Sequence, residues 1–173
     1  MGVVDSILEN PSAWTGERVI DELPVRIYDD PRRDDPSLPR WLRAVIVLCD
    51  FETHVQMQGL LGWWENAASN DLGNVMEAFQ AVGLSGQSEL LGSAREVLDP
   101  RALDSDPAQT IYSVSSFADR HGWVTEKQYT RFAQIEEQLS LNAEDASDLY
   151  AALVAHVNVG LAATPQPRPS VGP

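Results

Sequence analysis

Apolar residues recur at helical spacing through the middle of the chain. Between 41 and 67 they follow the i, i+3, i+4, i+7 pattern of an α-helix, with further apolar residues beside the main stripe. Such a broad apolar surface predicts a long helix that is buried on most sides. Gly59 and Gly62 interrupt it. Because glycine costs about 1 kcal/mol relative to alanine inside a helix, they indicate a bend or a close approach of another backbone.

Shorter helices are expected to follow. A first pair, over 71–82 and 85–98, is separated by Gly83, which stands where a left-handed residue commonly ends a helix. This pair predicts a helical hairpin. The same apolar spacing predicts a helix over 126–139 and a last helix after Asn142, which is a good N-cap residue.

The two ends of the chain differ from this helical body. Residues 1–38 are rich in proline and charge. The segment 3–10 (VVDSILEN) fits a short helix, and we expect the rest to form an extended N-terminal arm whose apolar residues cover the body. The single strand-like alternation in the chain lies in this arm, at 25–28 (VRIY). The body should span 39–162, and the proline-rich tail at 163–173 should be disordered. The predicted fold is therefore an all-α, compact multi-helix domain with an extended arm and a disordered tail.

Charge narrows the classes of partner. The 173 residues include 26 acidic and 12 basic side chains, for a net charge of −14. Direct nucleic-acid binding is not expected, because it depends on lysine and arginine at the phosphates. An acidic surface attracts basic proteins instead. No apolar run is long enough to span a membrane, and the first residues lack the basic region of a secretory signal. With Cys49 as the single cysteine, we expect a cytoplasmic protein.

Signatures of catalysis are missing from the sequence. There is no phosphate-binding loop, no HExxH and no CxxC. Glu52 and His54 are two residues apart and would point to different sides of a helix, which is poor geometry for an acid–base pair. Cys49 lies in an apolar segment typical of an inert, buried thiol. We therefore expect no cofactor, no metal site and no enzymatic activity.

The long helix carries a recognisable motif between His54 and Asn66 (HVQMQGLLGWWEN). It resembles the motif of a bacterial family of DNA-mimic-protein-like domains, most of which have no known function. The similarity extends over about 39–158. The matching positions of the motif, which we expect to be structural, are Val55, Gly59, Trp63, Trp64 and Asn66.

The match is broken at two places in the motif. His54 stands where the family has an acidic residue, and Met57–Gln58 replace its Asn-Gly. The role of these positions therefore does not transfer to this chain. Trp63 and Trp64 point in different directions on a helix, and we expect each indole to fill a different gap between neighbouring helices.

The resemblance implies an all-α fold without a cofactor. In the characterised branch of the family, acidic side chains arranged like DNA phosphates occupy the DNA-binding face of a transcription regulator. No lysine or arginine occurs between 132 and 167, around the last two helices. The tentative acidic binding face consists of Glu136, Glu137, Glu144, Asp145 and Asp148.

Taken together, these features predict a non-catalytic, acidic protein-interaction domain. The first hypothesis is a DNA mimic that binds a basic protein, such as a DNA-binding regulator. The alternative is an immunity or antitoxin-like protein that neutralises a basic toxin. We rank an enzyme with a helical pocket near His54 below both. The oligomeric state stays open, with a homodimer as one option.

Overall fold

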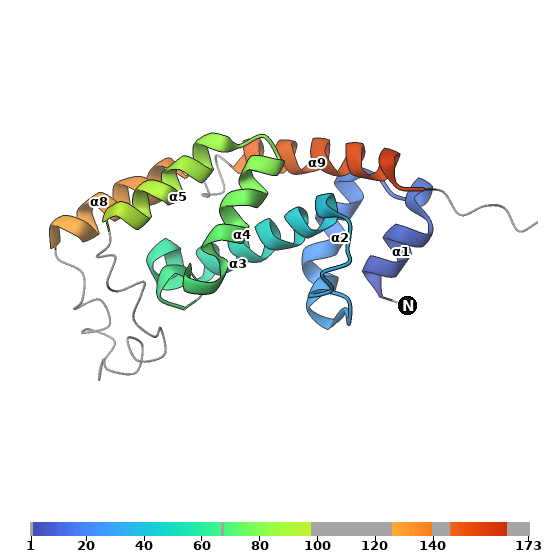
Figure 1. The fold of residues 1–173 in the computed structure, drawn as a ribbon, viewed down its shortest axis with the longest axis horizontal. Helices are drawn as coiled ribbons and strands as arrows, with labels where there is room; N and C mark the ends of the chain where they lie inside the picture. The colour runs from blue at the N-terminus through green and yellow to red at the C-terminus, as the bar shows by residue number, and fades with distance from the viewer. Residues whose placement is uncertain (1, 67, 98–125, 140–145, 166–173) are drawn as a thin grey trace, which may run out of the picture.

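A computed structural model describes residues 2–66, 68–97, 126–139 and 146–165 (Figure 1). Within these ranges every regular element is helical, so the predicted all-α fold is confirmed. The elements are α1 (Val3–Glu9), η1 (Pro11–Ala13), α2 (Gly16–Arg26), η2 (Ile27–Asp29), α3 (Arg40–Asn66), α4 (Ala68–Ala81), α5 (Ser85–Val97), α8 (Glu126–Gln138) and α9 (Ala146–Ala163).

Helix α3 is the centre of the fold. Figure 1 shows α4 crossing it, α5 and α8 side by side at one end, and α9 running along one side of the molecule over α2. The largest side chains that are fully buried come from several of these helices, and include Trp63 and Phe51 of α3, Phe79 of α4 and Phe132 of α8. One apolar core therefore joins the arm to the body. No helix in the described residues is long and apolar enough to cross a membrane.

The hairpin of α4 and α5 follows the sequence prediction. Gly83 has a φ of +84° and lies between the two helices. The N–H of Leu84 donates to the carbonyl of Phe79 at 2.8 Å, and the N–H of Gly83 donates to the carbonyl of Gln80 at 3.1 Å. This pair of bonds satisfies carbonyls that a helix end otherwise leaves without partners. The left-handed glycine was thus correctly located from the sequence.

The N-terminal arm is helical where an extended chain was predicted. Helix α2 covers 16–26, and the VRIY segment that suggested a strand forms the end of α2 and the 3-10 turn η2. Thr15 caps the helix by accepting from the Arg18 N–H at 3.2 Å. Val19 and Leu23 lie one turn apart and are both buried. Proline and charge hid this helical period. Pro24 lies inside α2, where it has no N–H to donate to the carbonyl one turn earlier, and the helix ends two residues later at Arg26.

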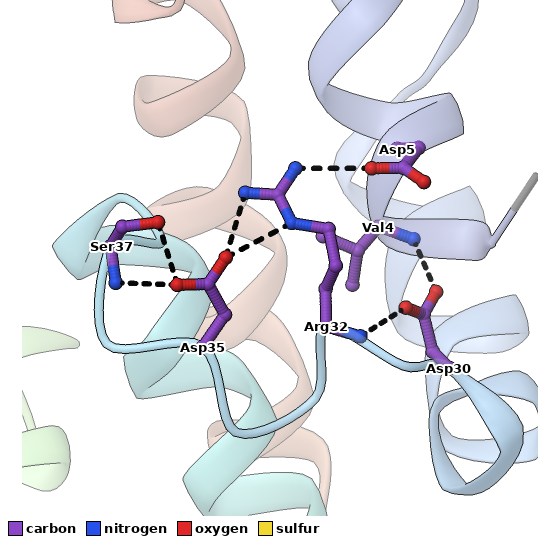
Figure 2. A network of polar contacts seen from close by, with 6 residues as sticks. All are labelled: Val4, Asp5, Asp30, Arg32, Asp35 and Ser37. Atoms are coloured by element: carbon purple, nitrogen blue, oxygen red, sulfur yellow. Dashed lines mark hydrogen bonds and ion pairs between the residues drawn. The ribbon is translucent and has the colours of Figure 1, made fainter.

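Buried Asp30 ties the start of the chain to the loop before α3 (Figure 2). Its carboxylate accepts from the Val4 N–H at 2.9 Å and from the Arg32 N–H at 2.9 Å. The Arg32 guanidinium then bridges Asp5 at 3.0 Å and Asp35 at 3.1 Å. The loop is therefore held against α1 by two contacts, from Asp30 to the Val4 N–H and from Arg32 to Asp5.

A second long-range cap joins α2 to α9. The N–H of Gly16 donates to Oδ1 of Asn158 at 2.8 Å, across 142 residues of sequence. A Cβ at Gly16 would collide with the carbonyl oxygen of Val154, so only glycine permits this approach of the two helices. The start of the last helix at Asn142, and residues 166–173 of the predicted tail, lie outside the described residues.

Candidate functional site

The motif helix α3 is bent at Gly59, as its sequence indicates. Gly59 has φ +73° and ψ 168°, so the helical hydrogen bonding is interrupted and a second helical segment begins at Leu60. The N–H of Leu60 would lack a helical partner, but it donates to Oε1 of Glu136 at 2.8 Å. A carboxylate at this position also faces the positive end of the new segment. Nothing local in the sequence indicates this pair, which is 76 residues apart.

Both motif tryptophans lie in the core. Trp63 is 2% exposed and Trp64 is 4% exposed. Their rings join an edge-to-face series in which Phe51 and Trp63 are 4.7 Å apart, Trp63 and Trp64 are 6.0 Å apart, and Trp64 and Phe132 are 5.7 Å apart. Trp63 thus packs within α3 and Trp64 reaches α8. Nε1 of Trp64 is buried without a hydrogen-bond partner.

The remaining motif positions have local partners. Val55 is buried, and Asn66 donates to the Gly62 carbonyl at 2.8 Å near the end of α3. At the positions where the motif is broken, His54 Nδ1 lies 2.8 Å from the Asp50 carbonyl and Met57 is 81% exposed. Gln58 accepts from Asn66 at 3.1 Å.

The predicted acidic face is only partly described. Glu137 on α8 and Asp148 on the first turn of α9 are exposed. Glu136 is half-buried and its carboxylate is engaged by Leu60 of α3. Glu144 and Asp145 lie outside the described residues. The five residues therefore stay a prediction as a binding face, and Glu136 has a structural contact that sequence reasoning missed.

Further exposed carboxylates lie on α4 and α5. Asp71 and Glu77 belong to α4, and Glu89 and Glu96 belong to α5. Glu89 and Glu96 are separated by two helical turns, which places them on one side of α5 about 10.5 Å apart along its axis. None of these four carboxylates forms an ion pair with a residue that the structure describes.

The arm has the opposite arrangement, because its arginines are largely paired. Arg18 and Arg26 both bind Glu22, at 2.7 and 2.9 Å. Arg33 binds Asp50 of α3 at 2.6 Å. All four arginines of the arm are paired, but its nine acidic residues still leave residues 1–38 with a net charge of −5.

A groove opens beside the first half of α3. Its volume is about 460 Å³, and it is bounded by α3, α4, the loop at 33–36 and His156 of α9. Burial lowers the pKa of His156, and its Nε2 is buried without a hydrogen-bond partner. His54 and Trp63 line this groove, so it lies where the sequence suggested a helical pocket, but its other walls come from separate segments that local patterns do not bring together.

The candidate reactive side chains of α3 are buried or have local partners. Burial raises the pKa of the Cys49 thiol to about 12, so it is a thiol and not a nucleophilic thiolate at neutral pH. Glu52 accepts from Gln56 at 3.1 Å, and His54 is directed to a backbone carbonyl. No group of three or more potential metal ligands occurs among the residues with described positions.

Comparison with known proteins bears out the resemblance seen in the motif. The family model described as DMP19-like protein matches residues 36–157, which is more than half of the chain. No curated protein and no solved structure matches. Domains of this kind are DNA-mimic-type domains and are in general non-catalytic. The chain belongs to the DMP19-like protein family.

Proposed function

We propose that this domain binds the basic DNA-binding face of a DNA-binding protein in place of DNA. The observation that carries the proposal is the distribution of unpaired carboxylates. Glu77, Glu89, Glu96 and Glu137 are exposed on α4, α5 and α8 without ion-pair partners in the described chain. A surface of this kind offers a basic protein what DNA offers it, namely fixed negative charges.

The spacing of the carboxylates supports this reading. Duplex DNA advances about 3.4 Å per nucleotide of one strand. The roughly 10.5 Å between Glu89 and Glu96 along α5 therefore corresponds to about three phosphates of one strand. Between 44 and 97 the chain has seven acidic residues and one basic residue, Arg95. Binding should consequently weaken steeply with salt.

Capture and competition test the proposal. The full chain is immobilised, a bacterial lysate is applied at low salt, and bound proteins are eluted with duplex DNA. A captured protein is then mixed with its labelled DNA, and the fluorescence anisotropy is followed as the chain is added. We expect the chain to displace the DNA. Captured basic proteins that duplex DNA does not elute would instead favour neutralisation of a basic toxin.

Charge-matched variants make the competition specific. The double variant Glu89→Gln/Glu96→Gln should compete about 2- to 30-fold less well, because two exposed ion pairs contribute about 0.4–2 kcal/mol together. The control Glu9→Gln/Asp29→Asn removes the same charge from exposed sites on the arm. If the two variants lost the same ability to compete with DNA, the interaction would depend on net charge alone, and the proposed face would be overturned.

A further inference from the structure

The groove beside α3 has the size of a ligand site. Its volume of about 460 Å³ falls within the roughly 300–1,000 Å³ of pockets that enclose small ligands. Figure 1 shows the first half of α3 lying between α4 on one side and the arm on the other, with α9 running along the same side of the molecule. The proposed acidic face does not use this groove, whose lining combines apolar, aromatic and charged side chains.

Trp41 provides an aromatic surface in this groove. The indole is half-buried and lies against Gly160 of α9. Elsewhere the chain places arginines over aromatic rings, with Arg18 at 4.3 Å from the Trp14 centroid and Arg33 at 4.6 Å from the Tyr28 centroid. Among the described residues, no cation is stacked on Trp41. Tryptophan is the side chain that binds a cation best through its ring face.

His156 provides an acceptor next to this ring. Burial keeps the pKa of His156 below its ordinary value. A hydrogen bond with the Trp41 backbone raises this pKa, but by less than burial lowers it. The imidazole is therefore neutral at pH 7, with one nitrogen as a donor and the other as an acceptor. Because the backbone of Trp41 uses the donor, the buried Nε2, which has no partner, is the acceptor.

The charges around the groove favour a cation. Asp34, Asp71 and Glu77 line it, are exposed and have no ion-pair partner among the described residues. Arg40 and Arg43 also line it without a partner, while Arg33 and Asp50 neutralise each other. The unpaired groups leave an excess of one negative charge, and the net charge of −14 adds to the attraction for cations.

We propose that this groove receives an arginine side chain of the basic partner, with its guanidinium stacked on Trp41 and donating to Nε2 of His156. The inference rests on the proposed function for the source of the arginine. A guanidinium has five N–H donors, no acceptor and a flat face. These properties match an acceptor without a partner, an indole without a stacked cation and a surplus of one carboxylate. Arginine anchors in such pockets commonly dominate the affinity of protein interfaces.

A pair of small probes tests the groove on the full chain. N-acetyl-arginine methylamide is titrated into isotope-labelled protein while the Trp41 indole N–H is followed by NMR. N-acetyl-citrulline methylamide has nearly the same shape without the charge. We expect saturable binding of the arginine probe in the millimolar range, as one side chain supports, and at least fivefold weaker binding of the citrulline probe. Equal binding of the two, or no shift at Trp41, would overturn the proposal.

Variants establish the sign of the charge that the groove selects. Asp71→Asn/Glu77→Gln should weaken binding of the arginine probe about two- to fivefold, and Arg40→Gln/Arg43→Gln should strengthen it by a similar factor. The arm control Glu9→Gln/Asp29→Asn should leave it nearly unchanged. The reverse signs would identify an anion site and overturn the proposal. All six sites are exposed, so folding should be preserved.

The outcome is separable from that of the proposed function. The α5 variant Glu89→Gln/Glu96→Gln should bind the arginine probe like the unmodified chain, because neither residue lines the groove. Probe binding without displacement of DNA from any captured protein would refute the DNA-mimic function and leave the groove standing. Displacement of DNA without probe binding would refute the arginine site in the groove and leave the DNA-mimic function standing.

Discussion

Replacement of Glu136 tests whether its carboxylate stabilises the bend in α3. Glu136→Gln keeps an oxygen that can accept from the Leu60 N–H but removes the charge that faces the start of the second helical segment. A charge at a helix N-terminus contributes about 0.3–1 kcal/mol, and this is the loss expected for Glu136→Gln. Glu136→Ala also removes the hydrogen bond, which joins a charged acceptor to a backbone donor at 2.8 Å.

The Glu136→Ala variant should lose about 1.5–3 kcal/mol of unfolding free energy, the usual contribution of a hydrogen bond to a charged group. In a chain of 173 residues, this corresponds to a fall in Tm of roughly 3–12 °C. Urea unfolding followed by tryptophan fluorescence measures the free energy directly, because Trp63 and Trp64 lie in the core just beyond the bend. The m-value should not change.

Glu137→Ala is the matched control. Glu137 is the next residue on α8 and is exposed, so its loss should alter the unfolding free energy by less than about 0.5 kcal/mol. Equal stabilities of the Glu136→Ala and Glu137→Ala variants would refute the cap. If Glu136→Ala instead weakened partner binding at unchanged stability, the residue would belong to the acidic face, as the sequence suggested.

Other substitutions test further parts of the fold. Gly59→Ala should cost about 1–3 kcal/mol in urea unfolding, because φ +73° with ψ 168° is a conformation essentially restricted to glycine; full stability would show that α3 can straighten. Asn158→Ala should cost about 1 kcal/mol by removing the cap on Gly16, which thermal melts would detect. Cys49, with its thiol pKa raised to about 12, should resist alkylation at pH 8 until urea unfolds the chain. Burial raises the pKa of Glu52, so the folded state favours the protonated acid. Glu52→Gln should therefore raise Tm at pH 7, and the gain should vanish below pH 4, where the unfolded chain is protonated too.

Local patterns were sufficient to predict the body but not the arm. The apolar period of α4 and α5 and the left-handed Gly83 depend on neighbours in sequence, so their prediction succeeded. The arm was predicted as extended because its prolines and charges outweigh its short apolar stripe. Its helices are stabilised by partners that are distant in sequence: Asp30 accepts from the start of α1, and Asn158 accepts from the start of α2. No local pattern reports such partners.

The candidate site shows the same limit. The conspicuous charge of the chain pointed to an acidic surface, and the exposed positions of Glu137 and Asp148 are what a helical period predicts. The engagement of Glu136 by Leu60, however, depends on how α8 meets α3. The groove likewise depends on four segments, and its orphaned His156 nitrogen becomes evident only when the burial of each polar atom is known.

The bond between Gly16 and Asn158 also orders events during synthesis. A ribosome adds about 5–20 residues per second, so the partner of Gly16, 142 residues later in the chain, is made roughly 7–30 s after it. Throughout that interval the apolar stripe of α2 lacks α9, which is the surface it packs against in the native fold. The nascent arm therefore exposes part of its apolar stripe to solvent until α9 has been synthesised, so the arm reaches its native packing only after that helix has emerged.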